Sequence, residues 1–238
     1  MEKKQLDTIL LNESDRFSTY LETYENGHKA ILKVINPECL EDISKYEKIL
    51  RQFNQEKQIL REMKIEGIPQ YMEGGKNYLK LSYIRGKTLK ELVKERKLST
   101  REKIYIMSSI FFILKNVHDN NIIHCDIKPS NIICGIDKKI YLIDFGSATK
   151  RGEKSIYIQG SGRFSAPEIY KNRDKRDYGV DIFSLMAVGY WLKYGKKYDI
   201  ESDNSHMGDF FLRWLSANPK KRFKTLNEIL EIIKERKL

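Results

Sequence analysis

Two short polar segments bring together side chains that could transfer a phosphoryl group. The first carries Asp126, Lys128 and Asn131, and the second carries Asp144 at the head of an Asp-Phe-Gly motif. A carboxylate can accept or orient the proton of a substrate hydroxyl, and a lysine can offset charge that develops on a phosphate. Amide and carboxylate oxygens bind Mg²⁺ together with phosphate and water. The four side chains therefore predict phosphoryl transfer from a metal-bound nucleotide.

Apolar runs on either side of these segments predict strands that would hold the polar side chains in place. They cover residues 121–123, 132–134 and 140–143. The simpler alternative is a pair of polar turns in which Asp and Asn bond to their own backbone. That alternative accounts for one Asp and one Asn, but it leaves Lys128 and Asp144 unexplained.

Lys33 lies within the apolar run 30–35, where an unpaired ammonium group would be costly to bury. Glu56 on the next predicted helix is the expected partner, although Glu47 and Glu62 lie on the same helix. The pair would hold the α- and β-phosphates of a nucleotide. A second interpretation places the lysine on an edge strand, with its ammonium group in solvent.

The order of the predicted elements indicates an α+β fold with two lobes. Strands are expected at residues 7–12, 17–24, 30–35 and 78–84. We expect a small N-terminal lobe over residues 1–84, rich in strands and with one main helix. A larger, mainly helical C-terminal lobe would cover residues 85–238, and a cleft between lobes is a common place for a ligand.

Capping boxes mark where the helices are expected to begin. In this motif a Ser or Thr and a Glu three residues later bond to each other's backbone. The pattern predicts helix starts at Ser44/Glu47, Thr88/Glu91 and Ser99/Glu102. The run 181–192 is apolar nearly all round, so we expect a buried helix there.

Three motifs in this order resemble the catalytic domain of eukaryotic-type Ser/Thr protein kinases, over nearly the whole chain. They are His-Cys-Asp-Ile-Lys-Pro-Ser-Asn at 124–131, Asp-Phe-Gly at 144–146 and Ala-Pro-Glu at 166–168. The resemblance implies a bilobal protein-kinase-like fold and the use of ATP with Mg²⁺ or Mn²⁺. It also implies transfer of the γ-phosphate to Ser or Thr hydroxyls of protein substrates, this chain itself included. Asp126 would be the base, and Asn131 with Asp144 would hold the metal.

The resemblance also assigns residues that would bind adenine. Leu81 matches the gatekeeper position, and the Ser82 carbonyl and the Ile84 amide match the hinge groups that pair with the base. Ala30 and Ile133 would contact the two faces of the ring.

Further residues match supporting positions of the family. Lys33 and Glu56 match its strand lysine and helix glutamate, and Asp181 matches an aspartate that braces the catalytic loop. Arg222 matches an arginine that pairs with the glutamate of Ala-Pro-Glu, here Glu168.

The turn between the first two strands departs from the family pattern, because residues 12–18 contain no glycine. Glycines at such a turn let backbone amides approach phosphates closely. Two interpretations stay open. Glu13 and Asp15 could obstruct the phosphates and weaken nucleotide binding. Alternatively, both acids face solvent and the amides of Ser14 or Ser18 still bind phosphate.

Two alternative functions also stay open. The missing glycines are compatible with a pseudokinase, a nucleotide-binding scaffold without transfer. A small-molecule phosphotransferase would share Asp126, Asn131 and Asp144. The resemblance disfavours this second alternative, because such relatives generally lack Lys128 and the Ala-Pro-Glu segment.

The composition fits a water-soluble globular chain. Of its 238 residues, 40% are hydrophobic and 32% are charged, and the most apolar run, 108–114, is too short to cross a bilayer. We therefore expect a cytoplasmic protein with no membrane partner. The net charge of +11 is compatible with a nucleic-acid partner or with a lysine-rich proteome. No basic run is interleaved with aromatic residues, so no nucleic acid is expected.

We expect activity without phosphorylation of the segment between Asp144 and Glu168. In the family, an arginine before the catalytic aspartate gathers the phosphorylated segment, whereas Cys125 offers no charge and is expected to be a small filler. Transfer rates of the dephosphorylated protein and of Ser155→Ala and Tyr157→Phe variants should be equal. A large rate gain on phosphorylation of the segment would contradict this expectation.

Overall fold

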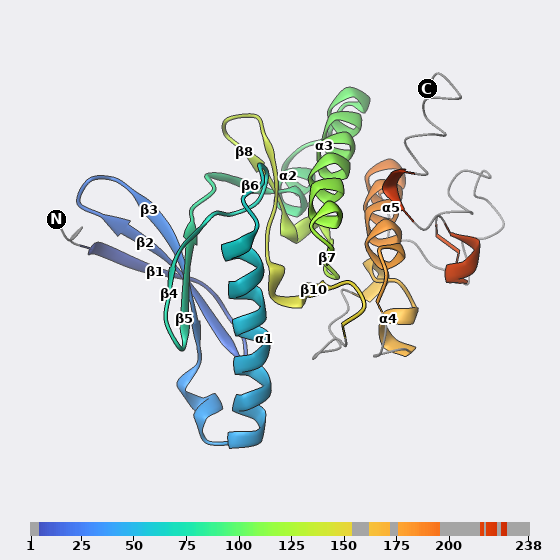
Figure 1. Cartoon of the computed structure of the whole chain (residues 1–238). Coiled ribbons are helices and arrows are strands. Elements are labelled where there is room, and N and C mark those ends of the chain that lie inside the picture. The colour runs from blue at the N-terminus through green and yellow to red at the C-terminus, as the bar shows by residue number, and fades with distance from the viewer. Residues whose placement is uncertain are drawn as a thin grey trace.

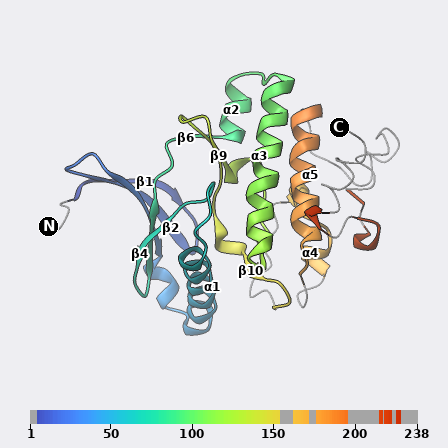
Figure 2. The same ribbon diagram turned by 45° about the horizontal axis from the view of Figure 1, so that its top comes forward.

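The first part of the chain forms an antiparallel sheet with one long helix beside it. The computed structural model describes residues 5–153, 162–171, 176–195, 215–216, 218–222 and 225–227. The sheet has five strands in the order β1-β2-β3-β5-β4. Their bounds are β1 Gln5–Glu13, β2 Phe17–Tyr24, β3 Lys29–Ile35, β4 Tyr71–Gly74 and β5 Tyr78–Ser82. Helix α1 (Ile43–Glu62) lies next to this sheet (Figures 1 and 2).

Strand bounds follow the available backbone partners. The strand predicted at 78–84 ends at Ser82, because Ser82 pairs with Ala30 at the start of β3 and its amide bonds the Gln70 carbonyl. Tyr83 and Ile84 therefore belong to the connection that follows, not to the sheet.

Helix α1 begins earlier than its sequence predicts. Asp42 is the N-cap, and its side chain accepts a hydrogen bond from the Lys45 amide. The predicted capping box of Ser44 and Glu47 is therefore wrong. An aspartate is an equally strong N-cap, and here it precedes the serine in the chain.

The remaining described elements are mainly helices with two small sheets. The capping boxes at Thr88/Glu91 and Ser99/Glu102 are confirmed, with both reciprocal bonds present. Strands β6, β8 and β9 form one small sheet, and β7 pairs with β10. The bounds are β6 Gly86–Thr88, α2 Leu89–Glu95, α3 Thr100–Asp119, β7 Ile122–Ile123, η2 Pro129–Asn131, β8 Ile132–Gly135, β9 Ile140–Leu142, η3 Phe145–Ser147, β10 Thr149–Lys150, η4 Gly162–Phe164, α4 Glu168–Lys171, α5 Gly179–Tyr194 and η5 Pro219–Lys221.

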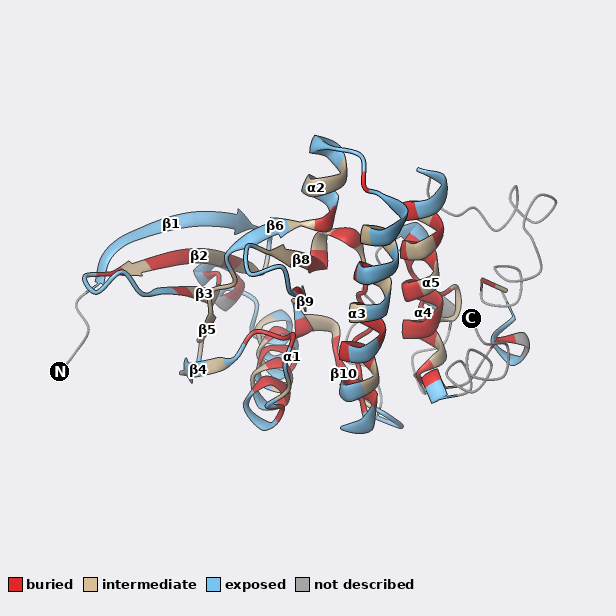
Figure 3. Ribbon diagram, turned by 90° about the horizontal axis from the view of Figure 1, so that it is seen from above, coloured by how far each residue is buried: buried red, intermediate tan, exposed pale blue. Residues whose placement is uncertain are grey.

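Helix α5 is a main element of the described helical part. It packs beside α3, and most of its residues are buried (Figure 3). The predicted buried helix at 181–192 is thereby confirmed. The same hydrophobic core continues through α3 to α1 and the five-stranded sheet, and the mixed α+β architecture expected from the sequence is present.

An ion pair fastens α4 to the start of α5. The Arg222 guanidinium lies 2.6 Å from the Glu168 carboxylate and donates to the Gly179 carbonyl at 3.2 Å. It also lies 5.0 Å from the centre of the Phe183 ring. Arg222 is buried, so these partners, in place of water, stabilise its positive charge.

We expect Arg222→Ala to lower the free energy of unfolding by about 2–4 kcal/mol, because Glu168 and Gly179 lose their donor. Urea denaturation measures the change. Lys115→Ala is the matched control, since it removes an exposed pair with Asp119 and should cost less than about 1 kcal/mol. Equal losses in the two variants would show that the Arg222 pair is not structural.

Candidate active site

The two polar segments of the sequence lie side by side in the structure. Strands β8 and β9 are antiparallel, with Ile132 opposite Leu142. Asn131 precedes β8 and Asp144 follows β9, so both turns leave the same end of this strand pair. The Ile143 amide donates to the Asn131 carbonyl at 2.9 Å and joins the two turns directly.

Asp126, Lys128 and Asn131 form one hydrogen-bonded cluster. The Asp126 Oδ2 atom lies 2.7 Å from the Lys128 ammonium and 2.9 Å from the Asn131 amide nitrogen. The same amide nitrogen donates to the Asp126 backbone carbonyl at 2.9 Å. Because the nitrogen of Asn131 faces Asp126, its Oδ1 atom faces away from that carboxylate and can serve as a metal ligand.

Asp181 at the start of α5 fixes the backbone that carries Asp126. Its carboxylate accepts bonds from the amides of His124 at 2.7 Å and Cys125 at 2.8 Å, and lies 2.9 Å from His118 Nε2. Cys125 has a φ of +66°, which is an unusual conformation for a residue other than glycine. The predicted bracing role of Asp181 therefore has a geometric basis.

The His124 ring connects the two turns a second time. Its Nδ1 atom accepts from the Asp126 amide at 3.2 Å, so the Nε2 atom carries the proton and donates to the Ile143 carbonyl at 3.2 Å. The ring also meets Phe145 edge to face, with 4.7 Å between ring centres. These contacts hold the Asp-Phe-Gly turn against the segment that carries Asp126.

Cys125 is a buried thiol. Burial raises its pKa to about 12, and the nearby Asp181 charge adds to the rise. The thiol therefore stays protonated near neutral pH, where a protonated thiol is a poor nucleophile. This environment agrees with a small filler and not with a redox-active group.

Lys33 bridges the sheet, the helix and the second turn. Its ammonium nitrogen lies 2.7 Å from Glu56 and 3.5 Å from Asp144, and both acids are on other elements. Glu47 and Glu62 on the same helix are exposed, so Glu56 is the partner that the sequence predicts. The solvent-facing interpretation of Lys33 is wrong, because the side chain is only 14% exposed.

The charged groups of this bridge shift one another's pKa values. Burial alone would lower the pKa of Lys33, but Glu56 and Asp144 raise it above its ordinary value. Burial alone would raise the pKa of Asp144, but the positive charge of Lys33 together with other neighbouring groups lowers it. Gly146 permits the close approach, because a Cβ atom there would lie 3.1 Å from both Lys33 Nζ and Asp144 Oδ1.

The glycine-free turn combines features of both interpretations left open by the sequence. Glu13 and Asp15 are exposed, so the acids face solvent. However, the Ser14 amide donates to the Phe17 carbonyl at 3.0 Å, and the Ser14 hydroxyl accepts from the Phe17 amide at 3.1 Å. These two amides are engaged inside the turn and do not point to a phosphate. Ser18 is buried in β2 and bonds to Asn36 through its hydroxyl.

The residues expected to contact adenine come from both sheets. Ala30 lies in β3, Leu81 and Ser82 end β5, Ile84 lies in the connection, and Ile133 lies in β8. Ala30 and Leu81 are buried, whereas Ser82, Ile84 and Ile133 are partly exposed. The five positions thus flank the connection between the two sheets.

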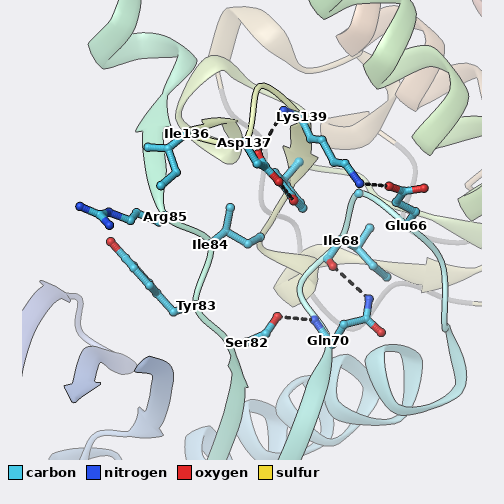
Figure 4. Close-up of a pocket in the computed structure, with 12 residues that line it drawn as sticks. Glu66, Ile68, Gln70, Ser82, Tyr83, Ile84, Arg85, Ile136, Asp137 and Lys139 are labelled. Carbon is cyan, nitrogen blue, oxygen red and sulfur yellow. Dashed lines mark hydrogen bonds and ion pairs between the residues drawn. The ribbon is translucent and has the colours of Figure 1, made fainter. Parts of the chain in front are cut away.

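A separate cavity of about 430 Å³ lies along the same connection (Figure 4). Ser82 and Ile84 line it together with Gln70 and Asp137, whereas Lys33 and Asp144 do not. The Ser82 hydroxyl accepts a bond from the Gln70 amide at 2.9 Å, which fastens this side of the connection.

Three polar residues at this site were not predicted from the sequence. Arg16, Asn36 and Gln52 hold the β1–β2 turn to the neighbouring elements. The available signal was the position of Gln52, four residues before Glu56 and thus on the same helix face.

The comparisons with known proteins agree with this geometry. Residues 17–229 match the protein kinase domain, and the chain belongs to that family. It is 30% identical to a probable serine/threonine-protein kinase of Clostridium acetobutylicum over 89% of this chain and 36% of that protein. It is 31% identical to an Aurora kinase of Debaryomyces hansenii over 86% of this chain and 55% of that protein. The chain therefore spans about a third to about half of the length of these relatives.

The donor set fits Mg²⁺ bound with a nucleotide. Within the residues that the structure describes, no group of three or more His, Cys, Asp or Glu could hold a metal. The side-chain oxygens of Asn131 and Asp144 would suit Mg²⁺, which usually takes few protein ligands and completes its shell with phosphate and water. Ser155 and Tyr157 lie outside the described residues. In the described part of the chain, no helix is long and apolar enough to span a bilayer.

We expect the contribution of Asp181 to stability to depend on pH. Burial alone would raise its pKa, but the bond and the charge of His118 lower it. A carboxylate with a lowered folded-state pKa stabilises the fold above its ordinary pKa of about 3.9, and this contribution is lost as the pH falls through the lowered value.

Urea denaturation of the wild type and Asp181→Asn measures this dependence. The difference in free energy of unfolding should be about 2–4 kcal/mol at pH 7 and should shrink below about pH 4. The exposed Asp7→Asn variant is the control and should show no such difference. A gap for Asp181→Asn that widens on acidification would contradict the assignment.

Proposed function

We propose that this chain transfers the γ-phosphate of ATP to Ser or Thr hydroxyls of protein substrates, itself included. One observation carries the proposal. The Asn131–Ile143 backbone bond joins the Asp126 cluster to the Asp144 turn, and Lys33 reaches that turn from the sheet. The Clostridium acetobutylicum relative is a probable serine/threonine-protein kinase, and Lys128 supports the same acceptor class.

In the proposed mechanism Asp126 accepts or orients the proton of the attacking hydroxyl. Two donors on Oδ2, Lys128 and Asn131, fix the orientation of its carboxylate. Lys128 also brings a positive charge to the place where charge develops on the transferred group. ATP with Mg²⁺ or Mn²⁺ would supply the phosphoryl group and neutralise the phosphate charge when bound.

Lys33 and Glu56 are proposed to hold the α- and β-phosphates, and Asn131 with Asp144 to hold the metal. Ala30, Leu81, Ser82, Ile84 and Ile133 are proposed to surround adenine. We also propose that residues 1–84 and 85–238 act as two lobes with this site between them. In support, the five-stranded sheet ends at Ser82 and the next sheet begins with β6.

A nucleotide-binding scaffold without transfer is the second candidate. One observation favours it: the amides of Ser14 and Phe17 are engaged inside the turn, so they do not cradle phosphate. Against it stand the intact Lys33–Glu56 pair and the ordered Asp126 cluster.

The proposal predicts that Asp126→Ala lowers kcat by about 10²–10⁴-fold, because the proton acceptor is lost. Asp144→Asn should still fold, because Glu56 remains beside Lys33, and should abolish Mg²⁺-dependent turnover. Transfer of labelled phosphate from Mg²⁺–ATP to a basic protein, with mapping of the modified residues, measures both. Asp119→Asn, an exposed aspartate outside the site, is the control and should retain full activity.

Phosphate found on Ser or Thr, and absent with Asp126→Ala, would exclude the scaffold. Nucleotide binding with no transfer by the wild type would instead support the scaffold and contradict the proposed transfer.

A further inference from the structure

Gln52 occupies a central position that the proposed mechanism does not use. Its side chain is buried on α1, one turn before Glu56. The Oε1 atom accepts from the Arg16 guanidinium in the β1–β2 turn at 3.3 Å. The Nε2 atom donates to the carbonyl of Gly146 in the Asp-Phe-Gly turn. One amide group thus contacts both turns that border the proposed phosphate site.

The β1–β2 turn is also fastened on its other side. Asn36 donates to the Ser14 carbonyl at 2.6 Å and accepts from the Ser18 hydroxyl at 2.7 Å. Its backbone amide donates to the Arg16 carbonyl at 2.9 Å. The turn is therefore a preformed unit with its own internal bonds, and Arg16 connects it to Gln52.

An aromatic contact fills the space beside this connection. Phe17, at the start of β2, stacks on Phe53 of α1 with 5.7 Å between ring centres. The Lys33 ammonium lies 4.9 Å from the centre of the Phe17 ring. A displacement of the turn would therefore disturb the surroundings of Lys33 and of its partner Glu56.

We propose that Gln52 is a positioning residue that couples the β1–β2 turn to the Asp144–Gly146 turn. The inference rests on the nucleotide-dependent transfer proposed above. In this chain the turn amides of Ser14 and Phe17 are engaged internally. Gln52 then fixes the place of the turn together with Asn36 and the Phe17–Phe53 contact, and the same side chain holds the carbonyl of Gly146 next to the proposed metal ligand Asp144.

A glutamine is suited to this task because its side-chain amide both donates and accepts. Gln52→Ala removes both contacts. Gln52→Glu keeps an acceptor for Arg16 but loses the donor to Gly146. Arg16→Ala removes the turn contact and leaves the bond to Gly146 in place. The three variants therefore distinguish the contact of Gln52 with Arg16 from its contact with Gly146.

Steady-state kinetics with ATP as the varied substrate should distinguish the effects of these two contacts. Gln52→Ala should lower kcat/KM by about 10- to 100-fold, with a higher KM and a lower kcat. Arg16→Ala should mainly raise KM, and Gln52→Glu should mainly lower kcat. The double variant Arg16→Ala/Gln52→Ala should lose no more than Gln52→Ala alone, because both remove the same turn contact.

Gln58→Ala is the matched control. Gln58 is a glutamine on the same helix, but it is exposed and bonds to Glu62. It should keep wild-type kinetics. The inference is overturned if Gln52→Ala behaves like Gln58→Ala, or if the Arg16 and Gln52 effects add fully.

Hydrogen exchange of the full chain gives a readout that needs no catalysis. Gln52→Ala should speed amide exchange at both residues 14–17 and 144–148, whereas Arg16→Ala should do so at 14–17 alone. If the wild type transfers no phosphate but Gln52→Ala speeds exchange at both segments, the proposed function is contradicted and the role of Gln52 is supported. Normal transfer by the wild type with unchanged exchange in Gln52→Ala would overturn the role of Gln52 alone.

Discussion

One buried ammonium group requires negative charge beside it, and the rest of the structure depends on how that charge is supplied. Lys33 lies in β3, and a charge in that position is tolerated only beside opposite charge. Glu56 supplies it from α1 and Asp144 supplies it from the turn after β9. The Lys33–Glu56 pair therefore fixes α1 against the sheet, and the Lys33–Asp144 pair brings the Asp-Phe-Gly turn to both. Gly146 suits the meeting point because a Cβ atom there would be in tight contact, at 3.1 Å, with two of the three charged groups.

A second anchor, Asp181, builds the other half of the site from the helical part of the chain. It binds two successive backbone amides before Asp126 and so sets the direction of the segment that carries Asp126. The Asn131–Ile143 bond and the His124 ring then join that loop to the Asp144 turn. Two buried carboxylates on different helices, Glu56 and Asp181, thus position the two halves of one polar cluster.

The sequence predicted the parts of the site that follow from local chemistry. The Lys33–Glu56 pair follows from the cost of burying a charge, and the capping boxes follow from side-chain reach. The start of α1 was mispredicted because Asp42 caps as well as Ser44, and periodicity does not distinguish them. The contacts of Gln52 were missed for a different reason. They join residues 36 and 94 positions apart in the chain, which no local pattern reports.

The central claim is that the Asp126–Asn131 and Asp144–Gly146 turns and Lys33 together bind one metal–nucleotide complex. The most direct measurement is a crystal structure with Mg²⁺ and a non-hydrolysable ATP analogue. The account predicts a magnesium ion about 2.1 Å from oxygens of Asn131 and Asp144, with phosphate oxygens on Lys33. A nucleotide whose phosphates lie away from Lys33 and the two turns, or a metal held by other residues, would contradict it.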